Sequence, residues 1–300
     1  MTDTIAPAIL SPITSAGRYL TFAIDDVTQV ATALRELARQ TDGEAMVIGI
    51  GQSLALALGR EIKGLAAYPP TSFAGVDAPA TPAALWCWLR GEDMGEILLR
   101  ARAVQTALRP AFTLESSVDA FRYDAVDRDL SGYEDGTENP EGDEAVTAAT
   151  VTGQGPGRDG SSFVVVQQWL HDFDRLAAIG PDRMDDVIGR HRADNSEMDD
   201  APDTSHVSRT DQESFDPPAH LVRRSMPWSD GLRAGLMFVG FGRDFRAFMV
   251  QWQRMTGVED GQTDALFRFT RPISGAFFWV PPMRGGQADL SALNIQLGGN

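Results

Sequence analysis

Apolar positions in the first half of the chain alternate between strand-like and helix-like spacing. Residues 18–26 are rich in β-forming side chains, so they predict a strand. In 27–40 the apolar residues recur at helical spacing and share one face, on which lie Val27, Val30, Leu34 and Leu37. Asp25 or Asp26 stands where a side chain is expected to cap that helix. The rest of this half predicts strands at 44–51, 84–91 and 112–124 and a second helix at 94–108.

The second half repeats this kind of pattern. Residues 161–173 contain three consecutive valines and predict a strand, and 181–190 predicts a helix that begins at a proline. Residues 232–242 are again strand-like. The segment 244–257 follows with helical spacing and an apolar face formed by Phe245, Phe248, Met249 and Trp252. A strand, a turn and another strand are predicted over 267–282.

Each half therefore predicts a β-α-β unit followed by further strands. Two such α+β units can pack their sheets together, which places one unit in 1–150 and the other in 151–300. The Gly-, Asp- and Ala-rich segment 141–160 is interpreted as the connection between them. A second polar segment, 191–205, is interpreted as a loop that ends just before a histidine.

Composition narrows the class of partner. The chain has 300 residues, of which 43% are hydrophobic and 23% charged, so extended disorder is not indicated. The 42 acidic residues outnumber the 26 Lys plus Arg and give a formal charge of −16, which would repel a nucleic acid. No run of about 18 apolar residues is present, so no membrane span is expected.

The compartment is inferred from the single cysteine and from the N-terminal residues. Cys87 lies in an apolar run and is expected to be a buried thiol, and one cysteine cannot form an intrachain disulfide. The first eighteen residues have neither an early basic cluster nor an uninterrupted apolar core, so they do not resemble a secretory signal. Both features suit a cytoplasmic location.

Several common catalytic motifs are absent. The segment 49–59 begins like a dinucleotide-binding fingerprint, but Leu54 stands where the third glycine is required. The phosphate-binding G-x-x-x-x-G-K-[ST] loop, the zinc motif H-E-x-x-H and the nucleophile elbow G-x-S-x-G do not occur. The four histidines are scattered and include no i, i+4 pair, so a clustered zinc site is not expected.

Three segments remain, and together they are specific. The loop SGYEDGTENP (131–140) is followed about seventy residues later by SHVSRT (205–210), and then by LVRRSMPW (221–228). In combination they resemble the dye-decolourising peroxidase family, in its bacterial branch with short loops (class B, or P-type). The resemblance runs from about Arg18 to about Pro282 and is strengthened by QQWLHDF, DDVIGRHRADNSEMDD and DALFRFTRPISGAFFWVP.

The resemblance implies a haem b enzyme with one haem per chain. Its fold would consist of two ferredoxin-like halves packed into one dimeric α+β barrel-type body, with the haem in the C-terminal half. The family reduces hydrogen peroxide and oxidises one-electron donors, such as dyes and phenols, through a ferryl intermediate. The family's proximal iron ligand falls on His206, and its distal residues fall on Asp135, Arg223 and Ser225.

The residue types suit that chemistry. A five-coordinate haem needs one neutral imidazole and one open face, and the other imidazole N–H needs an acceptor, for which Asp264 matches the family residue. Peroxide must lose a proton from one oxygen and gain one at the other, so Asp135 is the candidate acid–base group. Arg223 supplies a fixed positive charge for the leaving oxygen. Arg190 is a candidate for a haem propionate, although a helix-end arginine explains it nearly as well.

Purely structural roles for these residues, and other functions for the protein, are alternatives. Asp135 beside a glycine is often a turn-capping residue, and Arg223 with Arg224 could be a surface pair worth little free energy. A haem-handling protein, for haem transfer or iron removal, would share the fold and His206 but would not need Asp135 and Arg223 together. A non-haem interaction module is the third alternative. His171, His191 and His220 are interpreted as ordinary solvated or hydrogen-bonded histidines.

Assembly is expected from the resemblance rather than from the residues. A homo-oligomer is expected, and some family members are loaded into an encapsulin shell by a C-terminal peptide. The tail from Gly285 onward is shorter than such a linker and cargo peptide. Its apolar positions alternate, which suggests docking on a neighbouring subunit through Leu293, Ile295 and Leu297.

Overall fold

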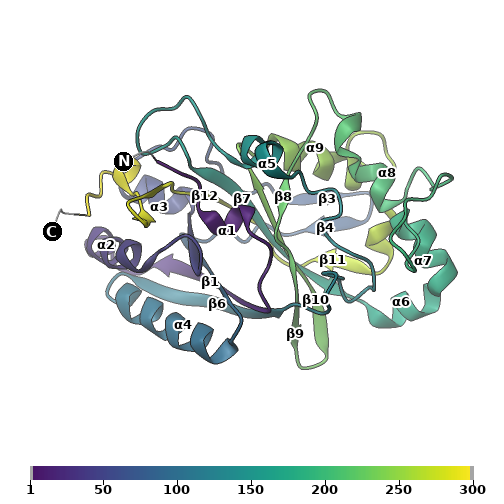
Figure 1. Ribbon diagram of the computed structural model, residues 1–300, viewed down its shortest axis with the longest axis horizontal. Coiled ribbons are helices and arrows are strands. Elements are labelled where there is room, and N and C mark those ends of the chain that lie inside the picture. Colours follow the sequence, from purple (N-terminus) through teal and green to yellow (C-terminus); the bar gives the residue numbers. More distant parts are fainter. Residues whose placement is uncertain (1–2, 298–300) are drawn as a thin grey trace.

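A closed antiparallel β-barrel forms the centre of the fold (Figure 1). The computed structural model describes residues 3–297. Strand β7 pairs with β12 on one side and with β10 on the other, and this double pairing closes the ring. The eight strands of the ring are β1 (Ala16–Ile24), β2 (Met46–Ile50), β5 (Leu85–Gly91), β6 (Phe112–Phe121), β7 (Ser162–His171), β9 (Met226–Asp230), β10 (Arg233–Gly242) and β12 (Ala276–Val280).

The barrel consists of two four-stranded groups with the same connectivity. The first pairs in the order β2-β5-β1-β6 and the second in the order β12-β7-β10-β9. Numbered along the chain, each group therefore pairs its fourth strand to its first, its first to its third and its third to its second. Helices separate the first and second strands and the third and fourth strands of each group, as the sequence predicted.

Only narrow seams join the two groups. Between β12 and β2 the register pairs Trp279 with Ile50, and between β6 and β9 it pairs Ala120 with Trp228. Pairing within the groups is far longer, since β1 and β6 pair over the whole of β1. Each group is therefore held mainly by its own strands, and aromatic side chains of the two groups also meet, since the ring centroids of Trp88 and Phe241 lie 6.0 Å apart.

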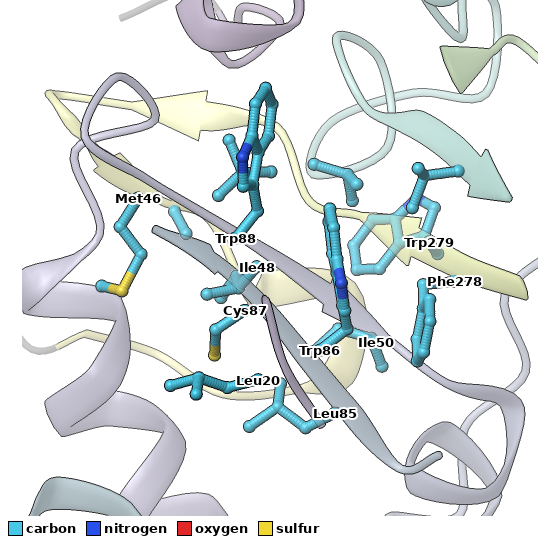
Figure 2. Close-up of a cluster of buried hydrophobic side chains, with 14 of the residues drawn as sticks. Leu20, Met46, Ile48, Ile50, Leu85, Trp86, Cys87, Trp88, Phe278 and Trp279 are labelled. Atoms are coloured by element: carbon cyan, nitrogen blue, oxygen red, sulfur yellow. The ribbon is translucent and has the colours of Figure 1, made fainter. Parts of the chain in front are cut away.

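Strand β5 shows why the apolar run 84–91 becomes a central strand. It lies between β1 and β2, and all its residues but the last are buried. Figure 2 shows Trp86 and Trp88 on one side of this strand and Cys87 on the other. Trp86 also stacks on Phe278, with 5.9 Å between ring centroids. Cys87 is fully buried, which confirms the prediction of a core thiol, and this burial raises the pKa of the thiol.

The two helices of the first group are α2 (Val30–Gln40) and α4 (Met94–Leu108), which pack side by side outside the barrel. Helix α4 has the predicted bounds, because Asp93 caps it by accepting a hydrogen bond from the backbone N–H of Glu96 at 3.0 Å. The predicted start of α2 is wrong by three residues. Asp26 instead accepts from the backbone N–H of Thr28, so it closes a turn before the helix.

Val27 consequently does not belong to the buried face of α2. Its side chain is 49% exposed, whereas Val30, Leu34 and Leu37 are fully buried as predicted. The spacing of apolar residues predicted the buried face correctly within α2. It was wrong only at the start, where a turn takes the place of the first predicted helical residues.

The second group carries α6 (Phe173–Ile179), α7 (Pro181–Ile188), α8 (His206–Thr210) and α9 (Arg246–Met255). Helix α9 buries Phe248 and Trp252, and Phe245 and Met249 pack partly buried beside them, as predicted. The segment 141–160, interpreted as the connection between the two units, also contains α5 (Gly142–Ala149), which buries Ala145 and Ala149. Alanine-rich sequence has high helix propensity even when the neighbouring residues are flexible.

Shorter elements complete the fold. Among them are α1 (Pro7–Leu10), α3 (Gln52–Ala57), β3 (Thr71–Phe73), β4 (Val76–Ala78), β8 (Val222–Arg223), β11 (Thr270–Pro272), β13 (Met283–Arg284), β14 (Gln287–Ala288) and three 3₁₀ turns, η1 (Gln212–Ser214), η2 (Ala265–Arg268) and η3 (Ser291–Leu293).

Leu293 and Ile295 are buried in the chain's own core, so the expectation that they dock on a neighbouring subunit is wrong. Within 3–297 no helix has the length and apolar character needed to cross a bilayer.

Candidate active site

A hollow of about 870 Å³, part of it open to solvent, lies between the second strand group, the loop 129–135 and helices α8 and α9. His206, Asp135 and Arg223 all line it, although they are far apart in the sequence. Much of the rest of its wall is apolar, with contributions from Ile188, Leu221, Leu236, Phe238, Phe248, Met255, Leu266 and Phe269. Such a cavity, apolar with a few convergent polar groups, is the usual form of a cofactor or ligand site.

His206 is the first residue of α8 and is held by a buried carboxylate. Its Nδ1 lies 2.7 Å from Oδ2 of Asp264, whose side chain is fully buried. The other carboxylate oxygen, Oδ1, accepts a hydrogen bond from the backbone N–H of Leu266 at 2.8 Å. Asp264 is therefore fixed by the backbone, and it fixes the imidazole so that Nδ1 carries the proton and Nε2 keeps its lone pair. The His206 side chain is 23% exposed and lines the hollow.

The short helix α8 is itself well anchored. Ser205 caps it by accepting from the backbone N–H of Ser208, and Thr210 Oγ1 donates to the His206 carbonyl at 2.7 Å. Arg209 is buried and forms two bonds to the carboxylate of Asp260, at 2.7 and 2.8 Å. Hydrogen bonding to Arg209 lowers the pKa of Asp260 to about 2.

Asp135 and Arg223 form an ion pair beside the same hollow. Nη1 of Arg223 lies 3.4 Å from Oδ1 of Asp135, and both side chains are about one-fifth exposed. Asp135 comes from the D-G-T-x-N-P loop and Arg223 from β8, so tertiary packing brings together the acid and the cation that the sequence singled out. An acid–base group and a permanent charge at one spot can move a proton and stabilise developing negative charge.

Asn139, for which the sequence alone suggested no role, holds the Arg223 backbone in place beside this loop. Its Oδ1 accepts from the backbone N–H of Arg223 at 2.7 Å, and its Nδ2 donates to the Arg223 carbonyl at 3.1 Å. The loop reaches this position through Gly136, which has a φ of +77° and whose Cβ, were there one, would meet Asn139 Nδ2 at 2.7 Å. The N of the D-G-T-x-N-P motif is therefore a clamp on the strand that carries the arginine.

Two of the predicted site residues, Ser225 and Arg190, lie beside this hollow and do not line it. Ser225 does not line the hollow beside His206; it lines a different one, which it shares with Asp135 and Arg223. Arg190 lies in a space adjoining His206, but its guanidinium already contacts the carboxylates of Glu138 and Glu197. A propionate there would have to join or displace those carboxylates.

A buried histidine also lines the hollow and was not predicted to do so. His171 Nε2 lies 3.0 Å from both carboxylate oxygens of Asp129, and its Nδ1 lies 2.7 Å from Thr270 Oγ1. Burial alone would raise the pKa of Asp129, but attraction to His171 and hydrogen bonds from His171 and Ser131 outweigh it, so that the pKa is lowered. The pair ties β7 to the start of the loop 129–140, called the distal loop below. The sequence signal was weak, because His171 and Asp129 are separated by 42 residues.

Comparison with known proteins identifies the family. A family model described as Dyp-type peroxidase, C-terminal, matches residues 126–285, which include the distal loop, His206, Asp264 and Arg223. The chain belongs to the DyP-type peroxidase family. A dye-decolorizing peroxidase of Rhodococcus erythropolis is 31% identical, over 92% of this chain and 86% of its own length. Membership makes the chain an oxidoreductase that uses peroxide as the electron acceptor.

Solved DyP structures share the fold. A variant of DypB from Rhodococcus jostii RHA1, in complex with heme, superposes with a TM-score of 0.82 at 26% identity and covers 91% of this chain and 95% of its own. The encapsulated DyP-type peroxidase from Mycobacterium smegmatis superposes with a TM-score of 0.80 at 27% identity, over 91% and 94% of the two chains. The closed antiparallel barrel described above is therefore the barrel of this family.

Proposed function

We propose that the chain is a haem b peroxidase that holds one haem per chain through His206. The observation that carries this proposal is that His206, with its Asp264 acceptor, and the Asp135–Arg223 pair line one apolar hollow. A DypB relative that matches the chain over 95% of its own length is described in complex with heme. That match also supports placing the chain in the bacterial short-loop branch.

The residues present fit a haem. His206 offers one neutral nitrogen with its tautomer fixed, which is what a single axial ligand requires. Within residues 3–297 no cluster of three or more His, Cys, Asp or Glu side chains could hold a metal ion by itself, so an iron bound to His206 would need the porphyrin nitrogens. Arg190, near His206, is the proposed cation for a propionate. Most of the lining residues follow residue 151, in keeping with a haem in the C-terminal half.

When bound, haem would supply the electrons and the open coordination position for cleaving the peroxide O–O bond. The protein's part lies in its own side chains. Asp135 takes a proton from the near peroxide oxygen and returns it to the far one, directly or through a water. Arg223 stabilises the negative charge that develops on the departing oxygen. Ser225, which shares a hollow with both residues, would orient a water or peroxide.

The second candidate is a haem-handling protein with the same ligand. The clamped ion pair favours the enzyme, because a carrier gains nothing from Asn139 holding Arg223 beside Asp135. Burial of Leu293 and Ile295 supports a role of this segment in the fold rather than as a free cargo peptide for a shell. Dyes and phenols are proposed as donors by analogy with the dye-decolorizing relatives.

The test is the visible spectrum of the protein with one equivalent of haem, before and after one equivalent of peroxide. His206→Ala should lose the Soret band of the wild type and abolish turnover. His220→Ala is the matched control, because the His220 side chain is partly exposed and its Nε2 lies 3.4 Å from a carboxylate oxygen of Glu213, and it should change neither. A wild-type spectrum and rate in His206→Ala would assign the iron to another ligand.

A further inference from the structure

Tyr133 stands two residues before Asp135, and it lines the hollow beside His206. The residue is buried, with 5% of its surface exposed. Its phenol O–H donates a hydrogen bond to Oδ1 of Asp185 at 2.5 Å. Burial, and then this hydrogen bond, raise the pKa of Tyr133, so the phenol keeps its proton at neutral pH. The wall of the candidate active site therefore contains a buried phenol whose proton points at a carboxylate.

Asp185 connects this phenol to the surface of the protein. It lies on α7, and its side chain is 23% exposed. Its Oδ1 also accepts a hydrogen bond from the backbone N–H of Arg192 at 3.1 Å. Its Oδ2 lies 3.4 Å from Nδ1 of His191, whose side chain is 52% exposed. A proton that Asp185 accepts can therefore be held there or exchanged with the exposed histidine and with solvent.

The other three tyrosines of the chain are placed differently. The Tyr19 oxygen is buried and, within residues 3–297, has no hydrogen-bond partner. The Tyr68 oxygen accepts a hydrogen bond from Nε2 of Gln167 at 2.7 Å. Tyr123 is 52% exposed and is not among the residues that line the hollow. Tyr133 is thus the tyrosine whose O–H is paired with a base at the candidate active site.

The pairing of a phenol with a carboxylate matters for one-electron chemistry. Loss of one electron makes a phenol a strong acid, so its proton leaves as well. A base that already accepts the O–H hydrogen bond lets the electron and the proton leave together. Trp169 and Trp252 also line the hollow, but an indole that has lost an electron is a weaker acid and can keep its N–H. The contact with Asp185 therefore distinguishes Tyr133 from these tryptophans as a group that can be oxidised and restored.

We propose that Tyr133 relays single electrons from donors at the surface to the haem, with Asp185 as the base for the phenol proton. The proposal rests on the proposed function, which places the haem in this hollow. Tyr133 gives one electron to the haem that peroxide has oxidised, and its proton passes to Oδ1 of Asp185. This leaves a neutral tyrosyl radical beside a protonated carboxyl group. A phenol or aromatic amine outside then gives one electron to the tyrosyl oxygen, Asp185 returns the proton, and the donor releases its own proton to water.

The donors that need such a relay are those too large to share the hollow with a haem. His191 and Arg192 are exposed beside Asp185, so a dye that binds against them lies next to the relay. The Arg192 guanidinium packs against the distal loop, since a Cβ at Gly132 would collide with it. A guanidinium held in this way can stack on a flat aromatic ring. The substrate class expected here is therefore a bulky aromatic dye with an oxidisable hydroxyl or amino group.

The experiment is rapid-freeze EPR spectroscopy of the full-length, haem-loaded protein mixed with one equivalent of peroxide and no donor. The wild type should give a tyrosyl radical signal, which should narrow when ring-deuterated tyrosine is incorporated. Tyr133→Phe should lose this signal and keep the Soret band. Asp185→Asn keeps a hydrogen-bonding group but no base, so the radical should form about tenfold or more slowly, since acid–base catalysis contributes about 10²–10⁴-fold.

Tyr68→Phe is the matched control, because Tyr68 is also a buried tyrosine but its oxygen accepts from an amide. It should leave the radical signal unchanged. In the wild type the radical should form more slowly in D₂O than in H₂O, because the proton moves with the electron. This measurement needs no change at Asp185, so it decides the role of the proton even if Asp185→Asn does not fold. In steady state, Tyr133→Phe should lower the turnover of a bulky polycyclic dye and leave the first reaction with peroxide unchanged.

Failure of the relay can be distinguished from failure of the proposed function. A wild type whose Soret band does not respond to peroxide would refute the proposed function, and the relay with it. With a normal response to peroxide, the relay alone is refuted if Tyr133→Phe keeps the wild-type signal, if Tyr68→Phe loses it, or if Asp185→Asn forms the radical at the wild-type rate. A wild-type signal that responds to deuterated tryptophan and not to deuterated tyrosine would also overturn the relay, because the oxidised residue would then be a tryptophan.

Discussion

Replacing Asn139 by alanine tests whether the Asn139 side chain positions Arg223 beside Asp135. The change removes two hydrogen bonds to the Arg223 backbone, of 2.7 and 3.1 Å, and leaves that N–H and carbonyl without these partners. Each such bond contributes about 0.5–1.5 kcal/mol net, so the free energy of unfolding should fall by about 1–3 kcal/mol. At roughly 2–3 °C per kcal/mol for a chain of this size, the Tm should fall by about 2–9 °C.

Turnover should fall as well, because Arg223 is no longer held beside Asp135. Complete loss of a preorganised charge costs about 10²–10³-fold, so a displaced but retained arginine should lower kcat/KM for peroxide by about threefold to 100-fold. The Soret band should stay unchanged, since the contact between His206 and Asp264 is untouched. Tm, haem content and kcat/KM for peroxide are measured on the same preparations.

Asn139→Asp is the matched control. It keeps an acceptor for the Arg223 N–H and loses the donor to the Arg223 carbonyl, so it should give about half the loss in stability. The reasoning is refuted if Asn139→Ala unfolds at the wild-type temperature and reduces peroxide at the wild-type rate. A loss of haem from the alanine variant would also refute it, because the residue would then support the cofactor pocket rather than the distal strand.

Three further predictions concern neighbouring groups. Asp135→Asn and Arg223→Leu should both retain haem, and at least one should slow the first reaction with peroxide by about tenfold or more in stopped-flow measurements. If neither variant slows this reaction, the result favours a haem-handling protein over a peroxidase. Asp264→Asn should weaken haem retention without unfolding the protein, measured by transfer of haem to an acceptor protein; unchanged retention would remove Asp264 from the ligand's support. The pKa of Asp129 is lowered in the fold, so its contribution to stability is present above about pH 4 and is lost as the pH falls through the lowered pKa. Asp129→Asn should therefore show a shallower loss of Tm below pH 4 than the wild type, and identical slopes would contradict the pairing with His171.

The sequence predicted the elements that depend on local patterns. Helix α4 has the predicted bounds because its apolar period and the Asp93 cap agree. The strand order of each group and strand β9 were not predicted, because pairing between distant strands leaves no local signal. The closure of the barrel was not predicted either, since the seams depend on single register pairs such as Trp279 with Ile50, which no local signal reveals.

The candidate site was predicted where a motif marked it and missed where only tertiary packing creates it. The structure brings His206 to Asp264 and Asp135 to Arg223, residues that the family resemblance named. Asn139 was in the quoted motif, yet its role requires a partner 84 residues away. The sequence also did not predict the pairing of His171 with Asp129 or the carboxylates that contact Arg190. Charge pairs between distant segments leave no regular spacing in the chain.

The order of the strands along the chain also determines when the site can form during synthesis. The first strand group is complete at Phe121 and can fold while the remainder is still being translated. The loop that bears Asp135 emerges next, but the strands that line the hollow are complete only at Pro272. Translation proceeds at roughly 5–20 residues per second. About 7–30 s therefore pass between synthesis of Asp135 and synthesis of the last strand that lines the hollow. We therefore expect haem to be captured after translation of the second group, by a chain whose first group is already folded.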